Sequence, residues 1–383
     1  MGTDVFRFLE QKPLYYDEID YNRFPTIYDE IKHHFTKNQT IIHLIGTNGK
    51  GSTGRFIAQV LYKHNISVGH YSSPHIRAFN ERIWINGKDT PDQTLENAHK
   101  KLQSILSKEH SKALSYFEYT TLLAMLCFAS CEVILLEAGL GGEYDATAVF
   151  EHTYTVITPI DFDHQAFLGE TLREIATTKL NIMAKEAVIA KQKHQEVEHI
   201  AKKIAQKKNA NLVFVTKDNN AQRLAQEVAT EQNMPLYLQE NLATAIVMLQ
   251  KLNISPKKED FYHKGLFGRC TQIAPNIIVD VGHNPLAAQA LYDTLKPDKY
   301  ILIYNTYGDK EYEKILTILQ PIILHVEIIP VFSQRVEERE KLQNILKQLK
   351  IQYCSFKQIQ NNKRYLVFGS FMVVEEFLKQ IDE

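Results

Sequence analysis

Short apolar runs that alternate with longer helix-period segments constrain the fold of this chain more than any other feature. Runs rich in Val, Ile and Leu lie at residues 41–45, 133–137, 154–158, 187–190 and 212–215, and again at 277–281, 300–304, 324–329 and 365–368. Segments with a helical period separate them, at residues 53–64, 117–130, 195–208, 285–295 and 335–348. This alternation predicts an α/β protein with mostly parallel sheets. Because the runs are continuously apolar, we expect helices on both sheet faces.

A charged, turn-like segment divides these two series of strands. The sequence SPKKED at residues 255–260 is followed by GLFGRC, and a fresh strand-turn-helix series begins there. Domains of about 100–250 residues are usual. We therefore expect a large N-terminal domain at residues 1–265 and a smaller C-terminal α/β domain at residues 266–383.

The charge balance and the apolar runs argue against several classes of partner. The chain has 44 basic and 45 acidic residues. It therefore lacks the excess of one charge that a nucleic-acid or membrane-surface partner would favour. The first twenty residues are acidic and lack the pattern of a secretory signal, and the apolar run at 121–131 is too short to span a bilayer. The four cysteines lack metal-ligand spacing, and Cys127 and Cys131 are interpreted as core thiols. We expect a cytoplasmic protein with reduced thiols.

A glycine-rich turn follows the first apolar run and consists of Gly46, Thr47, Asn48, Gly49, Lys50, Gly51 and Ser52. Glycines let backbone N–H groups turn inward around phosphate oxygens, and the following helix adds a favourable dipole. Lys50 can reach the outer phosphates of a nucleotide. The spacing departs from the general P-loop pattern, because Gly46 precedes Gly49 by three positions rather than five and the hydroxyl of Ser52 comes one place late. A plain strand-to-helix connection is the alternative, and the context favours nucleotide binding.

The form GTNGKGS is the one found in the Mur ligase superfamily, and further motifs narrow the resemblance. They are YSSPH at 71–75, FNERI at 79–83, EAGLGG at 137–142, DAT at 145–147, DH at 163–164, Lys179, Asn241, GR at 268–269, DVGHNP at 280–285, DK at 309–310 and GSF at 369–371. In this order they resemble folylpolyglutamate synthase/dihydrofolate synthase over about residues 20–375. The resemblance implies a P-loop ATPase-like, Mur-ligase-type ATP-binding domain followed by a Rossmann-like glutamate-ligase domain.

The resemblance also implies an activity. A ligase of this family transfers the γ-phosphate of ATP to a carboxylate, and the amine of glutamate then attacks the acyl phosphate. The implied substrates are ATP, glutamate and dihydropteroate or a folate, with two Mg²⁺ ions, and the family is typically monomeric. Whether this chain adds the first glutamate, extends folate tails or does both stays open at this point.

Roles follow from the resemblance for individual residues. The catalytic set is Lys50, Glu137, His164 and Lys179. The magnesium ligands are Ser73, Glu137, His164 and Lys179, the last as a carbamate. The nucleotide contacts beyond the glycine-rich turn are Asn241, Arg269, Asp280 and His283. The folate-side residues are Arg82, Asp145 and Thr147.

Plainer interpretations exist for the same residues. Glu137, at the end of an apolar run, could pair with a neighbouring cation; His164 could be an ordinary surface or core histidine; and Lys179 could be a solvated helix lysine. Asp280 could hold a ribose hydroxyl, whereas Asn284 could cap the helix that begins at Pro285.

The chain departs from the family pattern at a few positions. Glu143 stands where the family commonly has Arg, and Ala148 where it has Asn, so the preferred folate form is open. Val281 and Gly282 replace the usual Gly-Ala pair. The alternatives are another Mur-type amide ligase, a P-loop NTPase switch, and a nucleotide-binding regulatory protein without catalysis.

Overall fold

The computed structural model describes residues 4–13, 20–35, 38–262, 265–333 and 335–382. The chain forms two compact units, unit 1 with residues 1–228 and 240–263, and unit 2 with residues 229–239 and 264–383. Residues 229–239 cluster with unit 2, although the domain boundary was expected near residue 265. Helices α10 (Asn219–Glu231) and α11 (Leu236–Lys251) therefore each contribute to both units.

Unit 1 is built on an eight-stranded sheet with the order β4-β3-β2-β5-β1-β6-β7-β8. Its strands are β1 (Thr40–Ile45), β2 (Val68–Tyr71), β3 (Ile83–Ile85), β4 (Lys88–Asp89), β5 (Val133–Glu137), β6 (Tyr154–Ile157), β7 (Glu186–Ile189) and β8 (Asn211–Phe214). The six strands β2, β5, β1, β6, β7 and β8 run parallel, whereas β3 pairs antiparallel with β2 and with the edge strand β4. The predicted α/β class with a mostly parallel sheet is confirmed.

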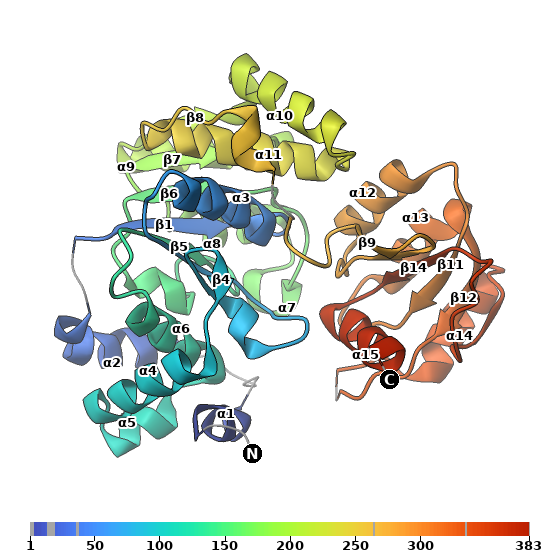
Figure 1. Cartoon of the computed structure of the whole chain (residues 1–383), viewed down its shortest axis with the longest axis horizontal. Helices are drawn as coiled ribbons and strands as arrows, with labels where there is room; N and C mark the ends of the chain where they lie inside the picture. Colours follow the sequence, from blue (N-terminus) through green and yellow to red (C-terminus); the bar gives the residue numbers. More distant parts are fainter. Residues whose placement is uncertain (1–3, 14–19, 36–37, 263–264, 334, 383) are drawn as a thin grey trace. The chain divides into compact units, whose positions relative to one another are not determined.

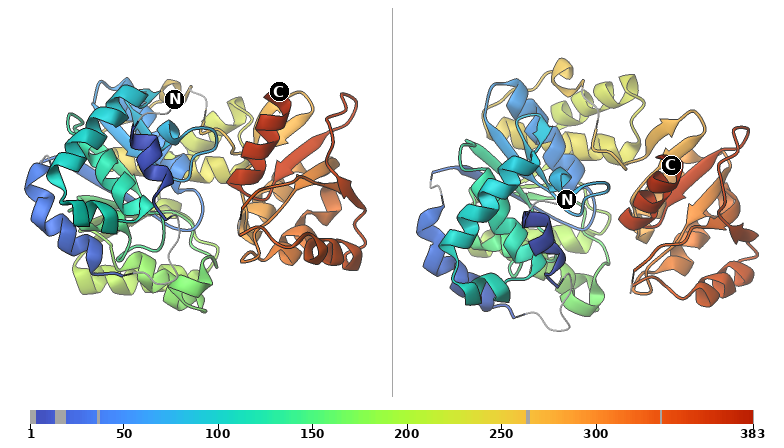
Figure 2. Two further views of the ribbon diagram at one scale, coloured as in Figure 1. Left: turned by 90° about the horizontal axis from the view of Figure 1, so that it is seen from below. Right: turned by 60° about the horizontal axis from the view of Figure 1, so that its bottom comes forward.

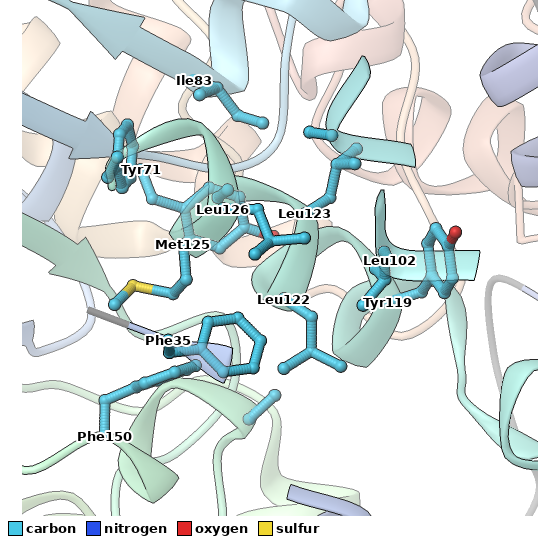
Figure 3. Packing of buried hydrophobic residues seen from close by; sticks show 14 of the residues in the cluster. Phe35, Tyr71, Ile83, Leu102, Tyr119, Leu122, Leu123, Met125, Leu126 and Phe150 are labelled. Carbon is cyan, nitrogen blue, oxygen red and sulfur yellow. The ribbon is translucent and has the colours of Figure 1, made fainter. Parts of the chain in front are cut away.

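Helices cover both faces of this sheet, as the continuous apolar strands predicted (Figure 1). Helix α3 (Lys50–Lys63) packs on β1, β2 and β5, while α4 (Asp92–Ile105) and α6 (Tyr116–Cys127) cover the opposite face. On that second face, fully buried Tyr119 and Leu122 of α6 pack with Leu102 of α4 (Figure 3). Helices α8 (Leu172–Leu180) and α9 (Gln195–Lys208) form a second core with β6 and β7. The remaining helices are α1 (Asp4–Glu10), α2 (Arg23–Ile31), α5 (Lys108–Ala113) and α7 (Gln165–Leu168).

Unit 2 has a six-stranded sheet with the order β13-β12-β11-β14-β10-β9. Figure 2 shows its strands and helices in the orange-to-red part of the chain. Its strands are β9 (Thr271–Ala274), β10 (Ile277–Val279), β11 (Tyr300–Tyr304), β12 (Ile323–Ile328), β13 (Tyr353–Ser355) and β14 (Tyr365–Phe368). Only β9 runs antiparallel to its neighbour. Helices α12 (Pro285–Leu295), α13 (Tyr312–Leu319) and α14 (Arg339–Gln348) share one core on one face, and α15 (Phe371–Asp382) packs against β14.

Strand register brings the predicted site segments to one edge of the sheet in unit 1. Leu44 of β1 lies beside Glu137 of β5, and Ile45 lies beside Ile157 of β6. The segments that follow these three strands therefore leave the sheet at the same carboxyl edge. Open α/β sheets bind ligands at this edge.

Several short elements were not predicted. Strands β2, β3, β9 and β13 have three or four residues, and β2 reads VGHY, so a run of apolar residues does not mark it. Helix α14 begins at Arg339 rather than at residue 335. Among the described residues, no helix is both long and apolar enough to cross a membrane. Cys131 is buried and the partly buried Cys127 packs on the same core, as expected of core thiols.

Two leucine substitutions in unit 2 test the assignment of its core. Leu302 of β11 is fully buried, whereas Leu324 of the neighbouring β12 is 57% exposed. Leu302→Ala should lower the free energy of unfolding by about 2–5 kcal/mol, because it removes buried contacts and leaves a cavity. The matched control Leu324→Ala should change it by less than about 1 kcal/mol. Urea unfolding measures both, and equal losses would contradict the assigned core.

Candidate nucleotide and ligase site

The glycine-rich turn is held tightly against its neighbours in unit 1. Gly46 has a φ of +140°, and a Cβ there would lie 2.1 Å from Thr158 Oγ1. Gly49 has a φ of +91°, and a Cβ there would lie 2.5 Å from Asn241 Oδ1. The backbone N–H of Thr47 donates to the Pro159 carbonyl at 2.8 Å. Both glycines are therefore required by backbone conformation and by space, and Asn241, which was predicted as a nucleotide contact, lies against the turn.

Lys50, the first residue of α3, folds back over this turn. Its Nζ donates to the Gly46 carbonyl at 3.1 Å and lies 3.9 Å from Glu137 Oε1. Glu137 is buried at the end of β5, and its Oε2 accepts from the backbone N–H of Ser73 at 3.4 Å. The structure thus brings together Lys50, Glu137 and Ser73. The ion pair with Lys50 is the plainer role considered for Glu137, and the two roles are compatible.

Two hydroxyls in the first turn of α3 lie buried without a hydrogen-bond partner in the described structure. They belong to Ser52, which is 3% exposed, and to Thr53, which is fully buried. A buried polar group without a partner costs free energy, so native proteins keep few of them. Phosphate oxygens or a hydrated cation would supply partners for Ser52. The turn, Lys50 and Ser52 together fit a nucleotide phosphate.

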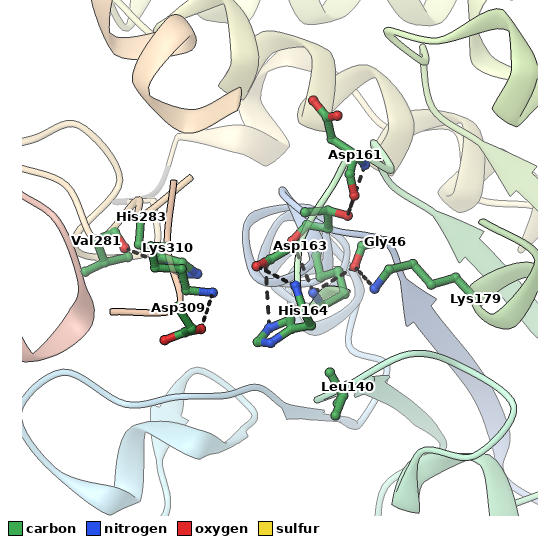
Figure 4. A network of polar contacts seen from close by, with 12 residues as sticks. Gly46, Leu140, Asp161, Asp163, His164, Lys179, Val281, His283, Asp309 and Lys310 are labelled. Atoms are coloured by element: carbon green, nitrogen blue, oxygen red, sulfur yellow. Dashed lines mark hydrogen bonds and ion pairs between the residues drawn. The ribbon is translucent and has the colours of Figure 1, made fainter. Parts of the chain in front are cut away.

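Lys179 is almost completely buried, which is unusual for a lysine, and only 4% of its surface is exposed. It lies in α8, and its Nζ donates to the carbonyl of Gly46 at 3.2 Å (Figure 4). Burial, with the nearby charge of Lys50, lowers the pKa of Lys179 to about 7, while Asp163 and Asp145 act in the opposite direction. The solvated-lysine interpretation is therefore wrong. At neutral pH a large share of Lys179 is the uncharged amine.

The GLGG segment packs directly onto the Lys179 backbone. A Cβ on Gly142 would lie 2.5 Å from the Lys179 carbonyl oxygen, so only glycine allows this approach. Asp145 holds the segment, since its carboxylate accepts from Leu140 N at 2.8 Å and from Thr147 N at 2.9 Å. Thr147 Oγ1 in turn lies 2.6 Å from His43 Nε2 inside the sheet. Asp145 and Thr147 are buried and position this loop.

His164 lies after β6 as the N-cap residue of α7, with a φ of 51°, which is uncommon for a residue with a side chain. Its backbone N–H donates to Asp163 Oδ1 at 3.0 Å, and its Nε2 lies 3.6 Å from Asp163 Oδ2 (Figure 4). Strained backbone of this kind is concentrated at functional sites. The side chain is 31% exposed at the carboxyl edge of the sheet, so a ligand can reach it.

Arg82 lies among aromatic rings beside the YSSPH segment. Its Nε donates to His75 Nδ1 at 2.8 Å, and its guanidinium lies 5.3 Å from the ring centre of Tyr116 and 5.9 Å from that of Phe79. Burial and the Arg82 charge lower the pKa of His75 to about 4, so His75 is neutral and can accept this hydrogen bond. Tyr116 was missed from the sequence. The sequence signal that could have indicated Tyr116 is the capping box of Ser115 and Glu118. This motif marks the start of α6, and Tyr116 is the first residue of that helix, beside Arg82.

The predicted residues of unit 2 form their own cluster. Asp280 is buried, and its carboxylate accepts from Gly282 N at 2.7 Å, from Cys270 N at 2.8 Å and from Tyr237 Oη at 3.1 Å. Asp280 therefore fixes the loops around it, and burial raises its pKa. Arg269 lies 5.2 Å from the ring centre of Phe371, and the His283 ring is 6.5 Å from the same ring.

Asn284 caps α12, as the sequence allowed. Its Oδ1 accepts from Ala287 N at 2.9 Å, and Pro285 is the first helical residue. The cap accounts for Asn284 alone, so Arg269, His283 and Asp280 stay predicted contacts for phosphate or ribose oxygens.

Comparison with known proteins agrees with these features. Residues 45–254 match the family profile of the Mur ligase middle domain. The chain is 31% identical to the dihydrofolate synthase/folylpolyglutamate synthase of Haemophilus influenzae, over 88% of each chain.

Solved structures share the whole fold. The chain superposes on Helicobacter pylori folylpolyglutamate synthetase with a TM-score of 0.81 and 40% identity, over 99% of this chain and 98% of that one. Escherichia coli FolC in complex with DHPP and ADP gives a TM-score of 0.83 and 25% identity, over 98% and 96% of the two chains. The chain therefore belongs to the dihydrofolate synthase/folylpolyglutamate synthase family of ATP-dependent glutamate ligases, which has the Mur ligase type of middle domain.

Proposed function

We propose that this chain adds L-glutamate to dihydropteroate and to folate tails, with ATP as the phosphoryl donor and ADP and phosphate as products. The observation that carries the proposal is the convergence of Lys50 and Lys179 on the Gly46 carbonyl, next to the buried hydroxyl of Ser52. The Lys50 ammonium and the N–H groups of a glycine-rich turn suit a polyphosphate, and the buried Lys179 amine lies on the same carbonyl. The H. influenzae relative's name covers both activities, and this supports the two acceptors.

The reaction needs an activated carboxylate, because a free carboxylate would have to expel oxide. A carboxylate oxygen of the acceptor attacks the γ-phosphorus of ATP, the bond to ADP breaks, and an acyl phosphate forms. The glutamate nitrogen then attacks the carbonyl carbon, phosphate leaves and the amine loses a proton. The nucleophiles come from the substrates, so the chain mainly positions them and neutralises charge.

In this proposal the turn and Lys50 hold the β- and γ-phosphates, and Asn241 packs against the turn and fixes its conformation. Glu137 orients Lys50 and offers an oxygen toward a cation. In unit 2, Arg269 and His283 contribute to nucleotide binding, while Asp280 holds the loop that carries them.

A cation fits the oxygen-rich part of the site. Ser73, Glu137, His164 and carbamylated Lys179 would hold two magnesium ions. Such ions, when bound, neutralise phosphate charge and act as Lewis acids.

Lys179 supplies an oxygen ligand only after it reacts with carbon dioxide. The uncharged Nζ attacks the carbon of CO₂, an N–C bond forms and one proton is released, which leaves an anionic carbamate. Burial makes the uncharged amine available near neutral pH. We propose this modified form as the active one, since an ammonium would repel a neighbouring cation.

We propose that the acceptor binds beside Arg82, on the aromatic wall formed with Tyr116 and Phe79. Asp145 and Thr147 act by holding the GLGG loop. Glu143 accepts a hydrogen bond at 3.0 Å from Nδ2 of Asn181, the residue that follows α8, so its carboxylate has a partner within unit 1. We also propose that the protein works as a cytoplasmic monomer, and its four free cysteines suit a reducing compartment.

Substrate dependence tests the proposed reaction. Phosphate release should require Mg-ATP, glutamate and either dihydropteroate or tetrahydrofolate, and mass spectrometry should show one added glutamate with each acceptor. Equal ATP turnover without an acceptor would instead indicate an NTPase. A product with tetrahydrofolate alone would show that the first-glutamate activity was assigned wrongly.

Lys50→Ala tests the phosphate role. It should lower kcat by about 10²–10³, the usual loss when one electrostatic stabiliser is removed. The control is Lys88→Ala on the exposed strand β4, which should leave kcat unchanged. Circular dichroism checks the fold of both variants, and near-normal turnover by folded Lys50→Ala would contradict the assigned role.

Lys179→Ala should lose most activity, and short carboxylic acids should restore part of it by supplying the missing oxygens. In the native protein the modification should form above about pH 7 and be lost as the pH falls below it, because protonation removes the attacking amine. Carbon-13 NMR with labelled bicarbonate detects the carbamate. A spectrum without a carbamate signal at pH 8, in fully active protein, would refute the proposal.

A further inference from the structure

A second group of potential metal ligands lies in unit 2, on the edge of its sheet. His325 and Glu327 belong to β12, and Cys354 belongs to the edge strand β13. One ligand atom from each residue lies within 4.8 Å of the other two. None of the three residues has a part in the ligase chemistry proposed above.

The backbone fixes this arrangement. Alternate residues of a strand point to the same face, so His325 and Glu327 share a face. Glu327 is directly paired with Cys354 in the parallel ladder between β12 and β13. Adjacent strands lie about 4.8 Å apart, which brings the thiol beside the carboxylate. The three side chains are therefore neighbours through sheet register rather than through flexible loops.

The burial of Glu327 distinguishes this group from an ordinary surface cluster. The residue is 7% exposed, and its Oε1 lies 3.2 Å from His325 Nε2. On its other side, Glu327 pairs with the fully buried Ile303 of β11. A buried carboxylate beside an apolar strand needs a compensating charge. His325 is hydrogen-bonded to this carboxylate, and a bound cation would supply a positive charge beside it.

We propose that His325, Glu327 and Cys354 form a binding site for a divalent transition metal, with Zn²⁺ as the preferred ion. Imidazole, carboxylate and thiolate are all zinc ligands, and ligands bound at about 2.0–2.3 Å in a tetrahedron lie roughly 3.3–3.8 Å apart. His325 Nε2 and Glu327 Oε1 lie 3.2 Å apart, in hydrogen-bond contact, so these two ligand atoms are already close to this range. Cys354 is exposed, so an ion can enter from solvent.

The donor set also separates this site from the magnesium chemistry of unit 1. Mg²⁺ prefers oxygen ligands in an octahedron, whereas nitrogen and sulfur ligands favour zinc. Three protein ligands leave a fourth position for water or for another ligand. A bound ion would also tie the three-residue edge strand β13 to β12 by metal bonds in addition to backbone hydrogen bonds.

Metal binding by the full-length protein tests the inference directly. Protein in excess Mg²⁺ is titrated with Co²⁺ as a spectroscopic probe and with Zn²⁺, and bound metal is counted by elemental analysis after desalting. The native protein should bind one Zn²⁺, and the Co²⁺ form should show a thiolate-to-cobalt charge-transfer band. Zn²⁺ should also raise the Tm.

Single substitutions identify the ligands. Cys354→Ser should abolish the charge-transfer band and the Tm increase, and should weaken binding beyond the roughly 10–100-fold cost of losing an outer-shell partner. His325→Gln should weaken binding similarly. The controls are Cys270→Ser, which removes a thiol elsewhere in unit 2, and His34→Gln, which removes a histidine of the exposed His33–His34 pair; both should leave the band unchanged.

Two outcomes would overturn the site. One is the absence of stoichiometric Zn²⁺ in the presence of Mg²⁺. The other is binding that survives Cys354→Ser and His325→Gln but falls with His34→Gln, which would indicate adventitious surface binding. Ligase activity is measured in parallel, and Cys354→Ser should retain it, because the site lies outside the proposed ligase machinery.

Discussion

The carbonyl oxygen of Gly46 accepts a hydrogen bond from each of two lysines, and the rest of the ligase site is arranged around this interaction. Lys50 reaches it from α3 and Lys179 from α8. Close packing of Gly46 on Thr158 fixes the carbonyl, and Gly142 lets the GLGG loop lie on the Lys179 backbone. In the proposed function the Lys50 ammonium binds the negative charge of a polyphosphate, and the buried Lys179 amine reacts with carbon dioxide to give a carbamate beside it.

Much of this arrangement could be predicted from the sequence. The strands at 133–137, 300–304 and 365–368 have the predicted bounds, because continuous apolar runs mark buried parallel strands clearly. The parallel order then brings Gly46 and Glu137 to one edge of the sheet. Short strands such as β2 and β13 escaped prediction, because pairing partners distant in the sequence define them rather than their own residues.

The side-chain partners were less predictable. Burial of Lys179 depends on packing between α8 and the GLGG loop, so the sequence alone left a solvated lysine open. Asp145 and Asp280 were predicted as ligand-side residues, and the structure adds several hydrogen bonds that each accepts from backbone N–H groups around it. The aromatic surroundings of Arg82 come from α6 and the segment around Phe79, which only the fold brings together.

The central claim is that the acceptor's own carboxylate attacks ATP. Dihydropteroate labelled with heavy oxygen in its carboxylate tests this claim directly, by mass spectrometry of the phosphate released in one turnover. The account predicts that each phosphate carries one labelled oxygen, because the carboxylate oxygen stays with phosphorus when the amide forms. Unlabelled phosphate, with glutamate still joined to the acceptor, would contradict it.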